Sequence, residues 1–235
     1  MITKKTSDYN FDFQTGEILL IDKPKGWTSF KVIRKIRNSI NVKKVGHSGT
    51  LDPMATGLLI VCTGKKTKEI SIYQGLPKTY EGKITLGKTT LSMDAETEVI
   101  TEKSIDGITE SKIYEAKEKF TGKIKQIPPM FSAKKLKGKP LYKIARKGKV
   151  VERTPGEVEV YDFSIKKIQM PDVWFKIKCS RGTYIRSIAN DLGEELGSGG
   201  FLSELRRTAI GDFQVEDALK PEEFLQMMTI MIGNV

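Results

Sequence analysis

Short apolar runs with strand-like patterns outnumber helical segments in this chain, and they restrict its fold class most strongly. Residues 17–22 and 58–64 are brief hydrophobic runs, and apolar residues alternate with polar ones over residues 80–86. Such patterns are typical of buried and half-buried strands. Residues 157–168 and 173–180 form a further predicted strand pair across a turn that contains proline. Because strands and helices do not alternate strictly, we predict an α+β fold with a mixed, mostly antiparallel sheet flanked by helices.

Three segments have the periodicity of amphipathic helices. The first begins near Thr28 and runs to Asn38, the second covers residues 109–121 with Thr109 as N-cap, and the third covers residues 183–197. Residues 220–228 predict one more short helix. The apolar side chains that we expect to face the core are Phe30, Ile33, Ile36 and Ile40 in the first helix, Ile113, Ala116 and Phe120 in the second, and Ile185, Ile188, Ala189, Leu192 and Leu196 in the third.

Length and composition argue for an intracellular globular protein. The 235 residues suffice for one large domain or two small ones with a sizeable core. No run of about 18 apolar residues and no apolar segment near the start is present, which argues against a membrane helix and a secretory signal. Cys62 and Cys179 lie in apolar contexts, so we expect core thiols in a reducing compartment. With one histidine and two dispersed cysteines, we predict no zinc site. The core thiols and the absence of a signal segment together predict a cytoplasmic protein.

Positive charge is concentrated in residues 123–153. This segment has eleven Lys or Arg and a single acidic residue, a net charge of +10 out of +11 for the whole chain. A solvated surface loop is one explanation for such a run. However, apolar residues are interleaved with the cations, namely Met130, Phe131, Leu136, Leu141, Tyr142 and Ile144. A structured basic arm that grips a polyanion such as nucleic acid explains both features, and we favour it.

Residues 46–57, GHSGTLDPMATG, combine the only histidine with a serine, an aspartate before a proline, and three glycines. A hydrolase triad is not favoured, because triad members usually come from distant parts of a chain and the stretch is not G-x-S-x-G. The spacing of a phosphate-binding loop, G-x-x-x-x-G-K-[ST], is also absent. By spacing alone, Asp52 fits a structural turn as well as it fits a functional carboxylate.

The same stretch resembles the catalytic motif of the TruB-type tRNA pseudouridine-55 synthases, and other motifs of that family follow in order. The similar segments are GEILLIDKPKGWTSFKVIRKIRN (16–38), VGHSGTLDPMATGLLIVCTGKKTK (45–68), TYEGKITLG (79–87), IPPMFSAKKLKGKPLYKIARKGKVVER (127–153), CSRGTYIRSIANDLGEELG (179–197) and FLSELRRTAIGDF (201–213). An ordered set of this kind, spread over residues 16–220, is specific to one family.

The resemblance implies the pseudouridine synthase fold and an isomerase that acts on uridine-55 in the T-loop of tRNA. The enzyme would break the C1′–N1 glycosidic bond and form a C1′–C5 bond, with no cofactor and no metal. It implies Asp52 as the nucleophile and Arg186 as the cation paired with it. Tyr80 would stack on the flipped uracil and take the C5 proton.

The family motifs also imply residues that bind the substrate or support the site. His47 would fill the space left by the flipped nucleotide, whose unstacking costs a few kcal/mol. Tyr184 and Leu205 would line the base pocket. Lys23 and Pro24 would support the loop that carries Asp52.

Partners and domain boundaries are further expectations from the resemblance. The enzyme would be a single catalytic domain over residues 1–235 whose insertion, residues 123–153, clasps the RNA, with no C-terminal PUA-type domain. Its partner would be the T-stem-loop of tRNA, bound by a monomer without a guide RNA or a membrane. A non-catalytic tRNA-binding protein or tRNA-folding chaperone of the same fold is the alternative.

The sequence leaves some motif positions without a role. The acidic run TTLSMDAETE departs from the family's pattern, so we attach no function to Asp94 or Glu96. For Arg206 and Arg207, contact with phosphate and bracing of the motif both stay open.

Overall fold

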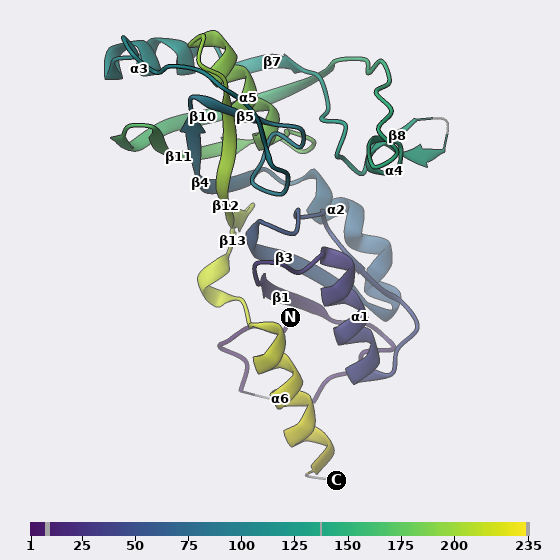
Figure 1. Cartoon of the computed structure of the whole chain (residues 1–235). Coiled ribbons are helices and arrows are strands. Elements are labelled where there is room, and N and C mark those ends of the chain that lie inside the picture. The colour runs from purple at the N-terminus through teal and green to yellow at the C-terminus, as the bar shows by residue number, and fades with distance from the viewer. Residues whose placement is uncertain (8–9, 137, 234–235) are drawn as a thin grey trace. The chain divides into compact units, whose positions relative to one another are not determined.

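The structure is a computed structural model, which describes residues 1–7, 10–136 and 138–233 (Figure 1). The chain forms two compact units. The first unit comprises Met1–Tyr80 and Leu205–Val235, and the second comprises Glu81–Glu204. Strands β4 (Lys78–Leu86) and β12 (Gly200–Ile210) contain the two division points, so each strand contributes residues to both units.

The first unit is built around strand β3, which pairs on both sides. Strand β1 runs antiparallel to β3, and residues 206–207 of β12 run parallel to it. Strand β2 pairs with β3 and β13 pairs with β12, both antiparallel. In chain order, the helices and the remaining strands of this unit are β1 (Ile18–Lys23), α1 (Ser29–Ile40), β2 (Val45–His47), β3 (Thr56–Thr63), the 3-10 helix η1 (Gly64–Glu69), α2 (Ile70–Gly75), β13 (Phe213–Gln214), the 3-10 helix η2 (Val215–Asp217) and α6 (Pro221–Gly233).

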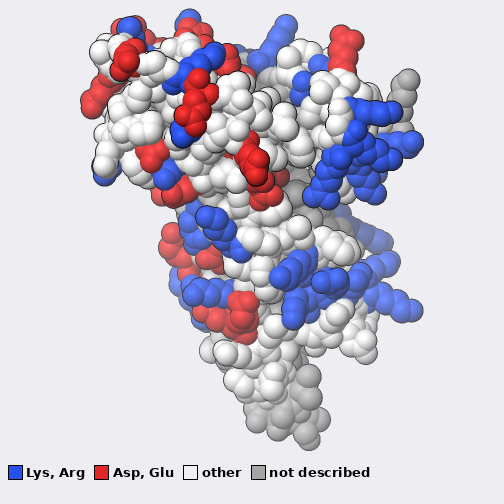
Figure 2. Space-filling view, in the orientation of Figure 1, with Lys and Arg blue, Asp and Glu red and all other residues white. Residues whose placement is uncertain are grey.

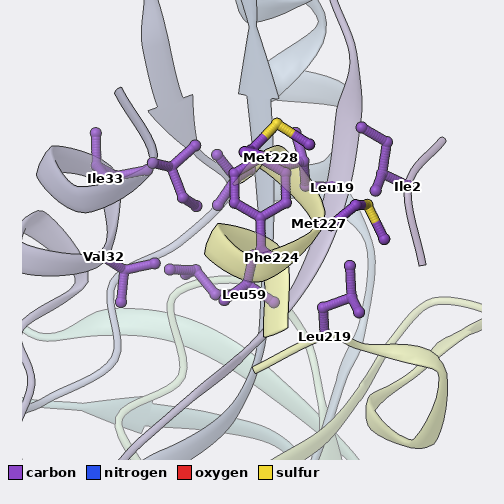
Figure 3. Packing of buried hydrophobic residues seen from close by; sticks show 12 residues of the cluster. Ile2, Leu19, Val32, Ile33, Leu59, Leu219, Phe224, Met227 and Met228 are labelled. Carbon is purple, nitrogen blue, oxygen red and sulfur yellow. The ribbon is translucent and has the colours of Figure 1, made fainter. Parts of the chain in front are cut away.

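Two hydrophobic clusters cover the faces of β1 and β3. Leu19 and Leu59 belong to the cluster that includes Phe224 of α6, which Figure 3 shows among side chains of β1, β3 and α1. The intervening residues Leu20 and Leu58 belong to the other cluster. Because both faces are buried, the two strands are continuous apolar runs, as the sequence indicated.

Local signals predicted helix α1 well, with one error. The Thr28 side chain accepts a hydrogen bond from the Lys31 amide at 3.0 Å, so it is the expected N-cap. Phe30 was expected in the core but is 64% exposed, and Val32 is buried instead. Residue 30 lies roughly a third of a turn from the buried face centred on Val32, Ile33 and Ile36.

In the second unit the sheet order is β12-β4-β11-β10-β7. Strands β10 and β11 are antiparallel, which confirms the predicted strand pair. The predominance of antiparallel pairing, with helices beside the strands, confirms the α+β class. The elements of this unit are β5 (Lys88–Thr90), β6 (Val99–Glu102), α3 (Glu110–Glu118), β7 (Gly122–Gln126), β8 (Lys135–Leu136), β9 (Lys139–Pro140), α4 (Leu141–Ala145), β10 (Gly156–Gln169), β11 (Asp172–Cys179) and α5 (Ile185–Glu195).

The basic segment begins inside this sheet and then leaves it. Residues 123–126 belong to β7, which pairs with β10, whereas the following residues form the short β8–β9 hairpin and helix α4. Met130 and Leu141 are buried, as expected of apolar anchors. Leu136 is exposed, so its assignment as an anchor was wrong. Met130 and Leu141 are therefore buried anchors on either side of the β8–β9 hairpin, whereas Leu136 in the hairpin is exposed.

Both cysteines are buried and neither forms a disulfide, which confirms them as core residues. Burial raises the pKa of the Cys62 thiol to about 11, so it stays protonated at neutral pH. Among the described residues, no helix has both the length and the apolar character that crossing a membrane requires.

Candidate active site

The expected site residues are distributed over both units. The first unit carries Lys23, Pro24, His47, Asp52, Tyr80 and Leu205, and the second carries Tyr184 and Arg186. Within the first unit, residues 48–55 connect β2 to β3 and contain Asp52; we call this segment the Asp52 loop.

A buried lysine holds the residue that follows Asp52. Lys23, at the end of β1, is completely buried, and its Nζ donates to the carbonyls of Trp27 at 2.6 Å and Pro24 at 3.1 Å. It also reaches the Pro53 carbonyl at 3.4 Å, which the Gly26 amide contacts at 2.8 Å. A buried ammonium needs such acceptors to offset its lost hydration. Lys23 therefore ties the start of α1 to the Asp52 loop.

The residue before Asp52 is held by a serine to which the sequence assigned no role. Ser29, the first residue of α1, is buried, and its Oγ accepts from the Leu51 amide at 2.9 Å. The same Oγ donates to the Leu51 carbonyl at 3.3 Å. One hydroxyl thus satisfies both backbone groups of Leu51, so the backbone is anchored on each side of Asp52.

Asp52 itself lies at the start of a tight turn. Its carbonyl accepts from the Ala55 amide at 3.1 Å, and its side chain is half-buried. Pro53 restricts the backbone of Asp52 toward extended angles. The loop therefore presents the Asp52 carboxylate from a backbone that has little freedom to move.

His47 ends strand β2, directly before the Asp52 loop. Its Nδ1 accepts from the Gly49 amide at 3.2 Å. Burial lowers the pKa of His47 below its ordinary value of 6.5, and the nearby Arg207 charge lowers it further. The ring is therefore neutral at pH 7, and because Nδ1 is an acceptor, Nε2 carries the proton and can donate.

Tyr80 and Leu205, on β4 and β12, are both buried. The start of β4 is anchored by Lys78, whose Nζ donates to the carbonyls of Gln74 and Leu76 at 2.6 Å each. These carbonyls lie at the end of α2, where a cation is favourable. Tyr80 follows two residues later, so its strand begins at a defined place.

In the second unit, Arg186 is the centre of a buried polar cluster. Its Nη1 donates to the Ser92 carbonyl at 3.1 Å and its Nη2 donates to the Phe131 carbonyl at 2.9 Å. Its Nε lies 3.5 Å from Oδ2 of Asp94, and the two side chains are 6% and 2% exposed. Asp94, to which the sequence assigned no role, is thus an acidic partner of Arg186.

Asp94 is itself oriented by its neighbours. Its Oδ1 accepts from Ser92 Oγ at 2.5 Å and from the Glu96 amide at 3.0 Å. The acidity of the segment was visible in the sequence, but the long-range contact with Arg186 was not. The pairing of Arg186 with Asp52 that the resemblance implies stays a prediction.

Tyr184 is the N-cap residue of α5, and a buried glutamine fixes its backbone. Gln126 Oε1 accepts from the Tyr184 amide at 2.9 Å, and Gln126 Nε2 donates to the Tyr184 carbonyl at 3.2 Å. Gln126 is the last residue of β7, just before the chain of the basic insertion leaves the sheet. It therefore also fixes the start of α5, the helix that carries Arg186.

The two arginines of β12 brace the first unit. Arg206 binds both carboxylate oxygens of Asp22, at 3.0 and 2.7 Å, and reaches Thr56 Oγ1 at 3.3 Å. Arg207 is 1% exposed and binds backbone carbonyls of the segment around Asp52. The sequence left two roles open for this pair, contact with phosphate and bracing of the motif. The observed contacts are with protein groups and correspond to bracing.

Each unit has a surface where cations gather. Figure 2 shows a group of Lys and Arg over the part of the second unit that contains β8 and α4. A hollow of about 1120 Å³ in the first unit has basic lining residues from three segments of the chain, namely Arg37, Lys43, Lys44, Lys65 and Lys68. Its described lining includes no acidic residue, and none of the five cations forms an ion pair with a described carboxylate. Sequence reasoning missed this hollow because its cations are dispersed along the chain.

Comparison with known families settles the class of protein. Residues 37–185 match the family described as "TruB family pseudouridylate synthase (N terminal domain)", and residues 186–233 match "tRNA pseudouridylate synthase B C-terminal domain". This chain belongs to the TruB family. Pseudouridylate synthases are isomerases, so the chain is an enzyme of that class, and the resemblance of its motifs is confirmed.

Relatives with that name cover nearly the whole chain. The tRNA pseudouridine synthase B of Chloroherpeton thalassium is 53% identical over 216 residues, which is 90% of each chain. That of Bacteroides fragilis is 43% identical over 221 residues, 92% of this chain and 95% of the relative.

Two chains from solved structures are similar to this chain and are longer. One chain of the structure titled "Crystal Structure of a Cbf5-Nop10-Gar1 Complex" is 30% identical, with a TM-score of 0.70, over 91% of this chain and 54% of that one. A chain of "Structure of H/ACA RNP bound to a substrate RNA containing 2'-deoxyuridine" is 27% identical, also with a TM-score of 0.70. This chain therefore spans about half the length of these two chains, and it has the pseudouridine synthase fold.

Proposed function

We propose that this TruB-family enzyme converts uridine-55 in the T-loop of tRNA to pseudouridine, with Asp52 as the nucleophile. The relatives' names support tRNA as the substrate. The observation that carries the proposal is the anchoring of residues 49, 51 and 53 around Asp52 by buried side chains. A nucleophile has to be held in its reactive geometry, whereas a solvated turn needs no such anchors. As the resemblance implies, the enzyme acts in the cytoplasm as a monomer without a guide RNA.

The reaction rearranges the nucleotide without gaining or losing atoms. Asp52 adds covalently to the flipped nucleotide, the C1′–N1 bond breaks, the uracil turns, and C5 forms a bond to C1′. The adduct with Asp52 then resolves, C5 loses its proton and N1 gains one. Covalent catalysis of this kind divides one difficult step into easier ones.

The other site residues have roles that their environments support. Arg186 pairs with Asp52 and is itself oriented by Asp94 and by the Ser92 and Phe131 carbonyls. Tyr80 stacks on the flipped uracil and accepts the C5 proton. Tyr184 and Leu205 line the base pocket.

His47 occupies the space that the flipped nucleotide leaves. A neutral ring suits this place better than a cation, because it can stack between bases without bringing a charge that must be desolvated. Its Nε2–H is the group left to donate a hydrogen bond to the RNA.

The function is tested by release of tritium from C5-tritiated uridine in a T-stem-loop RNA. Formation of the C1′–C5 bond expels the C5 hydrogen, so release should match the amount of target uridine. The same RNA with another base at that position is the control. If the protein binds the RNA tightly but releases no tritium, the non-catalytic chaperone alternative replaces the proposal.

We expect turnover to persist in excess chelator. The rearrangement involves no redox change and no hydrolysis, and the proposed nucleophile belongs to the protein. The measurement is the initial rate of tritium release with and without EDTA on an RNA whose folding is checked under both conditions. Loss of turnover on RNA that is still folded would contradict the expectation.

The cationic hollow supplies a second prediction. Replacing Lys43 and Lys44 by alanine should weaken binding of full-length tRNA, because unpaired cations in a hollow without acids attract phosphates. Each lost phosphate contact should lower the slope of log K against log salt by about 0.7–0.9. The matched control is the double replacement of Lys166 and Lys178, two exposed lysines of β10 and β11. Equal slopes for the two double variants would show that the hollow does not contact tRNA.

A further inference from the structure

Arg207 is the most deeply buried cation of the first unit apart from Lys23. It lies on β12, where it pairs with Gly57 of β3, and it is 1% exposed. Its neighbour Arg206 has a side chain that is 42% exposed. The two arginines therefore differ in environment although they are adjacent in the chain.

The guanidinium of Arg207 joins the two ends of the Asp52 loop. Its Nε donates to the Leu58 carbonyl at 2.7 Å, and its Nη2 donates to the Gly49 carbonyl at 3.1 Å. Leu58 lies in β3 just after the loop, and Gly49 lies near the loop's start. Both bonds come from a planar fork, so they fix the distance and the orientation of the two segments together.

One glycine of the motif, Gly57, allows the backbone of Arg207 to come this close to β3. A Cβ at Gly57 would lie 2.3 Å from the Arg207 carbonyl oxygen, which real Cβ atoms do not approach. The φ of Gly57 is +107°, a value that other residues rarely adopt. A Cβ at Gly49 would lie 3.7 Å from Arg207 Nη1, in ordinary contact. Gly57 is thus required for the packing of β12 on β3, and this packing places the guanidinium.

The charge of Arg207 is not explained by packing alone. No described acidic residue forms an ion pair with it, and its described partners are backbone carbonyls. Burying a cation without a counter-charge costs free energy, whereas an apolar side chain of similar size would fill the same space without that cost. What the cation contributes is its hydrogen bonds to the two carbonyls, which fix the geometry of the Asp52 loop.

We propose that Arg207 is a positioning residue, which holds the Asp52 loop in its reactive geometry through the Gly49 and Leu58 carbonyls. The inference rests on the proposed function, because it takes Asp52 as the reacting group. Arg207 touches neither substrate nor reacting atoms in this role. It acts by limiting the movement of the backbone that carries the nucleophile.

The experiment compares Arg207→Met and Arg207→Lys with Arg206→Gln as the matched control. For Arg207→Met we expect kcat to fall by about 10- to 100-fold, because small displacements of a reacting group have effects of this size. The affinity for the T-stem-loop should stay within about twofold, since no contact with RNA is removed. Arg207→Lys keeps the charge and can reach one carbonyl, so it should recover part of kcat. Arg206→Gln should lower the Tm while leaving kcat unchanged.

His47 provides a readout that a loss of stability alone would not move. It is the only histidine of the chain, so its ring resonances are unambiguous in an NMR titration. Removing the Arg207 charge should raise the His47 pKa in the folded Arg207→Met protein, and Arg207→Lys should not. Arg206→Gln should leave the titration as it is.

The other outcomes overturn the inference. A folded Arg207→Met enzyme with the wild-type kcat would show that the loop does not need the guanidinium. Equal losses of kcat and RNA affinity would indicate general damage or an RNA contact, and failure of both variants to fold would assign Arg207 to stability alone. An inactive wild-type enzyme in the same assay would instead refute the proposed function, so the two failures are distinguishable.

Discussion

Replacing Asp52 by asparagine should abolish pseudouridine formation while the protein still folds and binds RNA. An amide cannot form and release the covalent adduct at a useful rate, so we expect turnover to fall by about three orders of magnitude or more. The fold should be kept, because the turn depends on the Asp52 backbone carbonyl and on anchors at Leu51 and Pro53. Binding should persist or tighten, since a negative charge near RNA is removed. The measurements are tritium release and affinity for the T-stem-loop.

The opposite pattern belongs to a structural aspartate. Asparagine is a good substitute in a turn, so activity would then survive with little change. Asp106→Asn, at an exposed position in the second unit, is the matched control and should be fully active. Turnover by an Asp52→Asn preparation shown by mass spectrometry to contain no deamidated protein would refute the mechanism.

Removing charge from the basic insertion should produce the largest loss of RNA affinity. We expect alanine at Lys134, Lys135, Lys143 and Lys147 to reduce the slope of log K against log salt by about 3, because each lost phosphate contact removes 0.7–0.9. All four side chains are exposed, and none forms an ion pair with a described acidic residue. Their charge is therefore available to a polyanion.

The structure favours these substitutions over deletion of the insertion. The Phe131 carbonyl, at its base, accepts a hydrogen bond from Arg186, so a deletion that includes it would damage the polar cluster as well as RNA binding. The control removes the same charge elsewhere, with alanine at Lys103, Lys112, Lys166 and Lys178, all exposed. Equal salt slopes for the two quadruple variants would show that the insertion is only a solvated loop.

The sequence predicted the elements whose signals are local. Thr28 and Thr109 accept hydrogen bonds at the starts of α1 and α3, because a cap depends on residues within one turn of it. The alternation over residues 80–86 and the strand pair β10–β11 also followed from short-range patterns. Phe30 was placed wrongly because periodicity gives the width of an apolar stripe, but not which edge of the stripe the neighbouring elements cover.

For the candidate site, the motifs located Asp52, His47 and Arg186, but they did not reveal what holds them. Ser29 and Leu51 are 22 residues apart, and Arg186 and Asp94 come from segments separated by more than half of the second unit. A single sequence does not indicate such partners, since a serine at the start of a helix or an aspartate in a loop is equally compatible with exposure to solvent. One weak signal existed for Arg207, which falls between Leu205 and Ala209 at the buried positions of an alternating strand.

By itself the sequence determined the α+β class, the buried strands, the capped helices, the concentration of charge in residues 123–153 and, through its ordered motifs, the TruB family. These features depend on residue type and on spacing along the chain, which a sequence states directly. Only the tertiary structure decided that Arg207 is buried beside the Asp52 loop, that Asp94 faces Arg186, and that dispersed cations from three segments line one hollow. The physical reason is that hydrogen bonds, ion pairs and electric fields act through space. Their partners come together only when distant segments of the chain pack against each other, so residue type and spacing along the chain do not specify them.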